Sequence, residues 1–137
     1  MPDNFLEKFI EINAPVSTVW RVFTDPVLSR QMGGEYLTEW KVGSPLHWKN
    51  LDGQILTNGL ILKIEPEKIL QHNLVSTDAV SAGSILSVIT YEFQNRNGLT
   101  MLLAREDFVR PITDEEYNAA TEGWDAALQS VKEIAER

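Results

Sequence analysis

Hydrophobic and polar positions alternate with two different periods along this chain, and each period predicts a different element. A period of two is typical of strands, and a period near 3.6 is typical of helices. The segment from Phe5 to Ile12 alternates with a period of two and predicts a first strand. The same period returns after Gly34, and we expect strands over residues 36–40, 46–49, 54–64, 68–76, 85–93 and 99–108.

Glycines and small polar residues predict where these strands turn or bend. The pair Asn97-Gly98 lies between the last two strands and predicts a tight hairpin, because both residues tolerate positive φ. Gly59 lies inside a long strand and predicts a bulge or a bend, which a strongly curved sheet needs. The small and polar residues from Thr77 to Ser84 predict a loop.

Two short helices are predicted between the first strand and the second. The first follows Pro15, and its apolar positions are spaced i, i+3, i+4 and i+7 at Val16, Val19, Trp20 and Phe23. The second is predicted to begin at Asp25 and Pro26, as a cap and a first helical residue, and to continue through Met32. Gly33 and Gly34 then end it.

A long amphipathic helix is predicted from Thr113 to Arg137. Thr113 and Glu116 form a T-x-x-E capping box that marks its start. Its apolar stripe consists of Tyr117, Ala120, Trp124, Ala127, Leu128, Val131 and Ala135. One long, one-sided helix after a meander of strands predicts an α+β fold, in which a curved antiparallel sheet of about six to seven strands wraps around this helix.

Length, composition and charge limit the classes of protein to which the chain can belong. With 137 residues and 43% hydrophobic content, we expect a single domain over residues 1–137. The formal net charge of −8 and the absence of a basic cluster argue against a nucleic-acid partner. The sequence has neither a secretory signal nor an apolar run of about 20 residues, so we expect a cytoplasmic protein with no membrane span.

Few residues suggest chemistry. The absence of cysteine excludes disulfides, thiolate metal sites and cysteine nucleophiles. His47 and His72 lack metal-ligand spacing, and we expect ordinary strand residues rather than a metal site. There is no phosphate-binding glycine loop and no nucleophile elbow, so we expect no cofactor and assign no catalytic residue. Arg105 or Glu106 would be a functional candidate if it faced inward, but we expect both to face solvent.

Short motifs also follow one another in a characteristic order from about Phe9 to Arg137. They are Ile12-x-Ala14-Pro15-x-x-x-Val19-Trp20, Phe23-Thr24-Asp25-Pro26, Val42-Gly43, Asp52-Gly53, Gly59-x-Ile61-x-x-Ile64-Glu65-Pro66-Glu67, Thr90-Tyr91-Glu92-Phe93, Gly98-Leu99-Thr100-x-Leu102, Glu122-Gly123-Trp124 and Leu128-x-x-Val131-Lys132-Glu133. This ordered set resembles the heat-shock-protein-90 ATPase-activator homologue family, within the START-like (SRPBCC) ligand-binding superfamily.

The resemblance implies a helix-grip fold: an antiparallel sheet wrapped around the C-terminal helix, with a cavity between them. Members of the superfamily bind lipids, polyketides, hormones or aromatic metabolites, and a few are cyclases or hydratases. Residues 30–34 stand where the family often carries a pair of tryptophans, so we expect a differently shaped cavity mouth. The chain also has no room for the separate chaperone-docking domain of the eukaryotic activators, and the resemblance therefore does not extend to activation of the chaperone's ATPase.

If the sheet wraps the helix, the cavity wall takes side chains from the inner sheet face and from the helix stripe. Our candidates for ligand binding are Trp40, Trp48, Tyr91, Phe93, Leu102, Tyr117, Thr121 and Trp124. Ligand pockets are mostly apolar and aromatic with a few polar tips, but aromatic residues also simply fill cores. We assign Trp20 and Phe23 to the core. Gly123 is expected to allow close packing of the helix on a strand, the alternative being a gap for a ligand.

Three functions follow from these features. The first is binding of a small apolar or aromatic molecule between the sheet and the C-terminal helix. The second is a protein-interaction module that contacts a chaperone or another protein partner. The third, which the sequence supports least, is a cyclase-like enzyme, which would need an inward ionisable residue with a perturbed pKa.

Overall fold

The computed structural model describes residues 4–76 and 83–137, so residues 77–82 of the loop expected from Thr77 to Ser84 lie outside the described residues. The strands are β1 (Phe5–Ile12), β2 (Gly34–Leu37), β3 (Pro45–Asn50), β4 (Ile55–Glu65), β5 (Ile69–Val75), β6 (Ile85–Arg96) and β7 (Leu99–Phe108). The helices are α1 (Val16–Thr24), α2 (Pro26–Ser29), the short 3₁₀ helix η1 (Arg30–Met32) and α3 (Asp114–Ala135).

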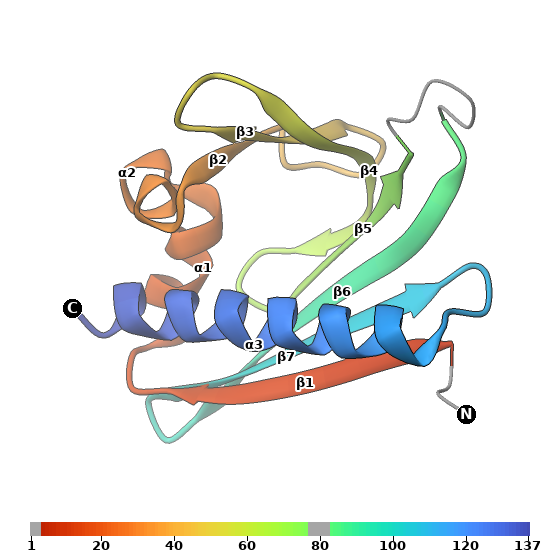
Figure 1. Cartoon of the computed structure of the whole chain (residues 1–137). Helices are drawn as coiled ribbons and strands as arrows, with labels where there is room; N and C mark the ends of the chain where they lie inside the picture. Colours follow the sequence, from red (N-terminus) through yellow and green to blue (C-terminus); the bar gives the residue numbers. More distant parts are fainter. Residues whose placement is uncertain (1–3, 77–82) are drawn as a thin grey trace.

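These strands form an antiparallel sheet that curves around α3 (Figure 1). Their order across the sheet is β1-β7-β6-β5-β4-β3-β2, so β1 pairs with β7 and the remaining strands form a meander. Helix α3 packs against β1, while α1 and α2 stand between the end of α3 and β2 (Figure 1). This arrangement confirms the expected α+β fold, a helix-grip fold with two short helices after the first strand.

Irregular pairing helps to bend the sheet. The register slips after Trp48, between β3 and β4, and again from Ile61 to Lys63, between β4 and β5. Such bulges increase the local twist of a strand. Gly59, where we expected a bulge or a bend, lies close to the second slip. A Cβ at Gly59 would lie 2.0 Å from the carbonyl oxygen of Asn73, so only glycine permits this close approach of β4 to β5.

The ends of two strands were predicted with different success. Asn97 and Gly98 have φ values of 55° and 86° and connect β6 to β7, which confirms the expected hairpin. The strand expected over residues 36–40 is wrong at its end, because β2 stops at Leu37. Beyond it Trp40 has a φ of 57°, and its ring packs edge-on against Tyr36 with the ring centroids 5.9 Å apart.

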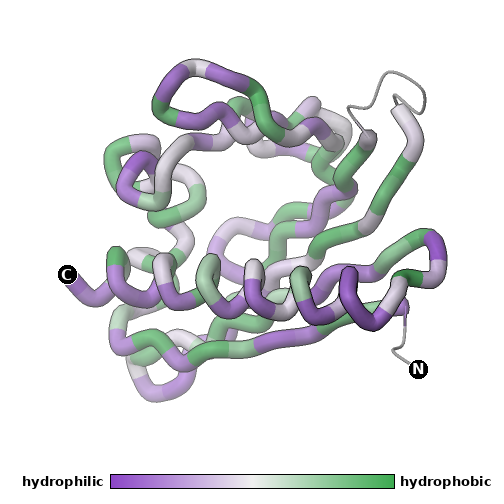
Figure 2. Tube along the Cα trace, viewed as in Figure 1, coloured by the Kyte–Doolittle hydropathy of each residue, from purple (hydrophilic) through white to green (hydrophobic). Residues whose placement is uncertain are grey.

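Helix α3 begins with the expected capping box. The Thr113 hydroxyl accepts a hydrogen bond from the Glu116 N–H, and the Glu116 carboxylate accepts one from the Thr113 N–H, both at 3.0 Å. Hydrophobic and hydrophilic residues alternate along its turns (Figure 2). However, the buried residues all lie in its second half: Leu128, Val131, Ile134 and Ala135. In the first half Tyr117 and Trp124 are half-buried and Gly123 is exposed.

The core lies where α1 and the second half of α3 meet the sheet. Phe23 and Phe93 are buried, and their rings pack edge-on with centroids 5.5 Å apart. Trp20 is half-buried and packs edge-on against Phe93 at 5.2 Å, so Trp20 and Phe23 contribute to the core as expected. Within residues 4–76 and 83–137, no helix has the length and the apolar character needed to cross a membrane.

Candidate ligand-binding cavity

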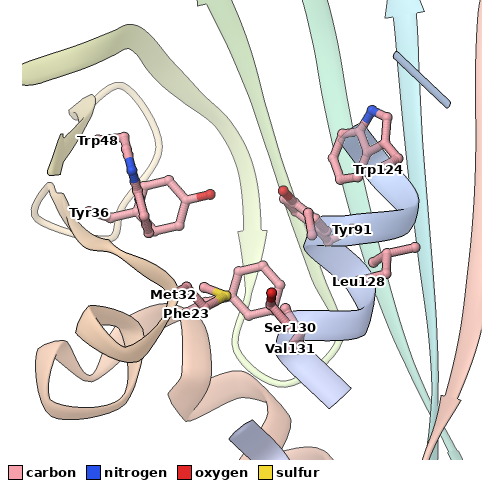
Figure 3. Close-up of a pocket in the computed structure, with 10 residues that line it drawn as sticks. Phe23, Met32, Tyr36, Trp48, Tyr91, Trp124, Leu128, Ser130 and Val131 are labelled. Carbon is pink, nitrogen blue, oxygen red and sulfur yellow. The ribbon is translucent and has the colours of Figure 1, made fainter. Parts of the chain in front are cut away.

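A cavity of about 210 Å³ lies between α3 and the inner face of the sheet (Figure 3). Its lining comes from α1, η1, β2, β3, β6 and α3 and consists of Phe23, Met32, Tyr36, Trp48, Tyr91, Trp124, Ala127, Leu128, Ser130 and Val131. Nine of these ten residues are apolar or aromatic, and none carries a formal charge. Ligand pockets for drug-sized molecules have volumes of roughly 300–1,000 Å³, so this cavity suits a smaller guest.

Edge-to-face ring contacts hold the cavity walls in place. On the side of β2 and β3, the Tyr36 ring meets the Trp48 ring with centroids 4.9 Å apart. On the opposite side, the Tyr91 ring meets Phe23 at 4.8 Å and Trp124 at 5.7 Å. Such contacts favour defined ring orientations, so the walls keep their shape without a guest.

Two tyrosine hydroxyls provide polar tips within the aromatic lining. The Tyr36 hydroxyl points across the cavity toward the Tyr91 hydroxyl (Figure 3). Burial raises the pKa of Tyr91 well above its usual range, and the nearby Tyr36 and the charge of Glu106 raise it further. Burial also raises the pKa of Tyr36. Both hydroxyls are therefore protonated at neutral pH, and each can donate a hydrogen bond.

His72 on β5 lies against both tyrosines. Its ring centroid is 6.4 Å from that of Tyr36 and 6.3 Å from that of Tyr91, and the residue is 2% exposed. Its Nδ1 lies 3.0 Å from the carbonyl oxygen of Asn73, which can only accept, so Nδ1 carries the proton. Burial lowers the pKa of His72, so the ring is neutral at pH 7. Its Nε2 is therefore a buried acceptor, and it has no donor among the described residues.

Glu106 points inward, contrary to our expectation that it faces solvent. Its Oε1 accepts a hydrogen bond from Trp124 Nε1 at 2.9 Å, and its Oε2 accepts one from the Ser87 hydroxyl at 2.7 Å. The alternation along β7 explains this position, because Leu102 and Ala104 are buried on the same face. That alternation was the available signal in the sequence.

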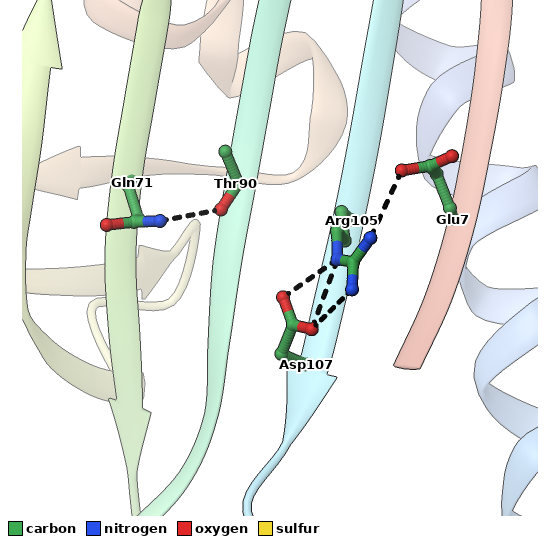
Figure 4. Close-up of polar contacts among 5 residues, drawn as sticks. All are labelled: Glu7, Gln71, Thr90, Arg105 and Asp107. Atoms are coloured by element: carbon green, nitrogen blue, oxygen red, sulfur yellow. Dashed lines mark hydrogen bonds and ion pairs between the residues drawn. The ribbon is translucent and has the colours of Figure 1, made fainter. Parts of the chain in front are cut away.

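Arg105 faces the opposite side of the sheet, as expected for a residue that alternates to solvent. Its guanidinium donates two hydrogen bonds of 3.0 Å to the carboxylate of Asp107 and lies 3.6 Å from that of Glu7 (Figure 4). On the same outer face, Gln71 donates a hydrogen bond to the Thr90 hydroxyl at 3.0 Å (Figure 4). The side chains of Arg105 and Glu106, which follow each other in β7, therefore lie on opposite faces of the sheet.

A second compartment of about 300 Å³ adjoins the cavity along α3. It shares Tyr91, Trp124 and Ala127 with the cavity and adds Glu106, Ala120 and Gly123. A Cβ built at Gly123 meets no atom within 4 Å. The expectation that Gly123 packs closely on a strand is therefore wrong, because Gly123 is exposed and lines this compartment.

The residues proposed from sequence fall into three groups. Trp48, Tyr91 and Trp124 come together in the cavity. Phe93 and Leu102 lie in the core. The other three are half-buried and do not line the cavity: Trp40, Tyr117 and Thr121.

Sequence reasoning also missed several residues around the cavity. The largest omission is Tyr36, which the strand register places opposite Trp48. Met32 and Ser130 were missed because neither follows a pattern that indicates a pocket. His72 was treated as an ordinary strand residue, since nothing local shows that its Nε2 lacks a partner.

Comparisons with known proteins agree with this fold. The family model described as activator of Hsp90 ATPase homolog 1-like protein matches residues 13–136. No curated protein matches the chain. Protein MLL2253 from Mesorhizobium loti has a similar structure, with a TM-score of 0.77 and 20% identity, over 95% of this chain and 95% of that one.

Two further solved structures are similar. CalU16 from Micromonospora echinospora has a TM-score of 0.74 at 19% identity, over 96% of this chain and 75% of that chain. The Aha1 dimer from Colwellia psychrerythraea has a TM-score of 0.74 at 18% identity, over 96% of both chains. At these identities the likeness shows the fold alone. Because the family model covers nearly the whole sequence, this chain belongs to the activator of Hsp90 ATPase homolog 1-like family.

Proposed function

We propose that this protein binds a small apolar or aromatic molecule in the cavity between the sheet and α3. The observation that carries the proposal is the position of the apolar stripe of α3. Its last turn buries Ile134 and Ala135 in the core, whereas Trp124, Ala127, Leu128 and Val131 line a cavity with aromatic walls. A helix that served only to fill a core would bury its stripe along its whole length.

The polar groups around the cavity support the same proposal. The Tyr36 and Tyr91 hydroxyls reach the cavity as possible donors, and the nearby His72 Nε2 is a buried acceptor without a donor among the described residues. Buried polar groups are nearly always hydrogen-bonded in folded proteins. A guest whose polar group meets one of these atoms would satisfy it, and the surrounding rings would hold the apolar part of the guest.

Native mass spectrometry of the freshly purified protein tests this function directly. We expect an added mass of a small molecule that disappears when the protein is denatured. The molecule released is then identified and titrated back into the stripped protein. A ligand-free mass, together with no binding by a panel of small aromatic molecules, would contradict the proposal and favour the protein-interaction function, which pull-down experiments would then address.

Two substitutions separate binding from folding. We expect Trp48→Ala and Trp124→Ala to weaken binding of the recovered molecule at least about fivefold, because each removes an aromatic wall contact. Phe9→Ala is the matched control, because Phe9 is 69% exposed and lies outside the cavity lining. Thermal unfolding of each variant shows how much of the fold is retained. Unchanged affinity in both tryptophan variants would count against the proposal.

A cyclase-like reaction is the second candidate, and one observation favours it. Tyr91 lines the cavity and His72 lies beside it, and burial shifts the pKa of both groups, which is a feature of catalytic acids and bases. Conversion of the recovered molecule by the wild-type protein, lost in Tyr91→Phe, would support this reaction. Recovery of the molecule in unchanged chemical form after long incubation would argue for binding alone.

A further inference from the structure

The carboxylate of Glu106 points into the fold without a positively charged partner. Its two hydrogen-bond donors, the Trp124 indole and the Ser87 hydroxyl, are both neutral. Among the described residues, every ion pair involves other carboxylates. A partly buried carboxylate without a cationic partner destabilises the folded protein, because the carboxylate loses part of its hydration and no counter-charge compensates for that loss.

The cationic side chains of the neighbouring elements are already paired elsewhere. On the inner face of β1, Lys8 lies 3.2 Å from Asp125. Arg110, which follows β7, lies 3.0 Å from Glu116. The formal net charge of −8 adds to the negative potential around the protein. The charge of Glu106 is therefore available to a molecule from outside the chain.

Glu106 also lies within reach of the aromatic cavity. It lines the second compartment, whose wall includes Tyr91 and Trp124 of the first cavity. It lines a third hollow of about 380 Å³ as well, which extends toward the start of α3. Gly123 leaves the second compartment open, since it has no side chain and no atom lies within 4 Å of a Cβ built there. A guest in the aromatic cavity can therefore extend past Trp124 to the carboxylate.

We infer that the molecule bound in this cavity is an aromatic amine whose protonated amino group pairs with Glu106. The inference rests on the proposed binding function and names the class of its ligand. An ammonium group supplies both the missing positive charge and up to three hydrogen-bond donors. A carboxylate-bearing guest would be repelled at this position, and a neutral alcohol would leave the charge of Glu106 uncompensated.

A pair of probes of the same shape tests the inference. 2-Phenylethylamine is protonated at neutral pH, as a lysine side chain is, whereas 2-phenylethanol is neutral. We expect calorimetric titration of the wild-type protein at pH 7 to show at least about tenfold tighter binding of the amine, because charge-assisted hydrogen bonds are roughly twice as strong as neutral ones. A ratio below about threefold, or tighter binding of the alcohol, would overturn the inference, since a charge-assisted contact would then be absent.

The Glu106→Gln variant identifies the residue responsible. Glutamine keeps the shape of the side chain and an oxygen for the Trp124 indole, but it has no charge. We expect it to remove most of the preference for the amine while changing the affinity for the alcohol less than about threefold. Glu92→Gln is the matched control, because it removes one negative charge from the neighbouring strand β6 at a residue outside the compartments that Glu106 lines.

The outcomes separate this inference from the proposed function. Equal binding of the two probes would overturn the amine assignment and leave the aromatic cavity as a binding site. A preference for the amine that persists in Glu106→Gln would overturn the role of Glu106. Binding of neither probe would overturn the inference, while native mass spectrometry would still decide the proposed function. If Glu106→Gln fails to fold, the wild-type preference alone decides between amine and neutral guest.

Discussion

At the scale of single residues, burial decides the charge state of the groups around the cavity. Tyr36 and Tyr91 stay protonated and His72 stays neutral, in each case because burial disfavours the charged form. Glu106 differs from these residues because it accepts hydrogen bonds on both of its carboxylate oxygens. Because Glu106 is, among the described residues, the one carboxylate beside an otherwise uncharged aromatic site, we expect the site to select its guests mainly by their charge.

The lowered pKa of His72 predicts a specific dependence of stability on pH. Burial lowers this pKa below its ordinary value of 6.5, so at pH values just below 6.5 the unfolded chain binds more protons than the folded protein. The free energy of unfolding therefore rises with pH through this range and falls on acidification. We expect urea unfolding to show lower stability at about pH 5.5 than at about pH 7.5, since protonation of His72 favours the unfolded chain.

A His72→Asn variant provides the control for this pH dependence, because its amide can still donate to the carbonyl group of Asn73. We expect a smaller slope between the two pH values. Carboxylates affect the free energy of unfolding in a different, more acidic pH range. Burial raises the pKa of Glu35, but Arg30 and Lys49 lower it to a net value below 4.5, so its stabilising contribution is lost only under more acidic conditions. Identical slopes in the variant and the wild type would contradict the role of His72.

At the scale of elements, α3 is one continuous helix with two different environments. Its second half buries Leu128 and Val131 in the core. Its first half places Trp124 and Gly123 beside open compartments. The capping box at Thr113 gives this less buried half its own local stabilisation. The same helix thus anchors its second half in the core and contributes its middle to the wall of the cavity.

Two glycines in different elements have opposite roles, which predicts opposite effects of the same substitution. We expect Gly59→Ala to destabilise the protein by about 1–3 kcal/mol, because its Cβ would lie 2.0 Å from the Asn73 carbonyl oxygen and overpack the sheet. We expect Gly123→Ala to stabilise it by about 0.5–1 kcal/mol, because alanine is the better helix former and meets no neighbour. Urea unfolding of both variants measures these changes, and destabilisation by Gly123→Ala would show that the helix packs more closely than the structure indicates.

At the scale of the whole molecule, the core and the cavity adjoin each other, and Phe23, Tyr91, Leu128 and Val131 belong to both. The core joins α1, the sheet and the second half of α3, whereas the cavity lies between Tyr36 and Trp48 on β2 and β3 and the middle of α3. Local stability follows the density of buried apolar contacts. We therefore expect the first half of α3, which has no buried residue, to have a lower local stability than its second half.

This division predicts uneven hydrogen exchange along α3. We expect the amides of residues 128–135 to exchange at least about tenfold more slowly than those of residues 117–124, because only the former belong to the core. A ligand in the cavity should slow exchange in the latter range and raise the melting temperature as its concentration increases. Mass spectrometry with and without ligand measures both effects, and uniform protection along the helix would contradict the prediction.

Much of the fold could be predicted because periodicity is a local property. The alternation in β6 and β7, the hairpin at Asn97-Gly98 and the capping box at Thr113 all depend on residues close in sequence. The candidate site was predictable only in part. Trp48, Tyr91 and Trp124 were identified from residue type, but residue type does not distinguish a cavity wall from a core position such as Leu102.

The amino-acid sequence by itself determined the elements, the faces that they bury and the family to which the chain belongs. Only the tertiary structure decided which inward side chains meet and where space is left between them. Tyr36 and Tyr91 face each other across the cavity although they lie 55 positions apart in the sequence, and Trp124 donates a hydrogen bond to Glu106 from a different element. These contacts depend on strand register, on bulges and on the curvature of the sheet, which accumulate over many residues and leave no local pattern.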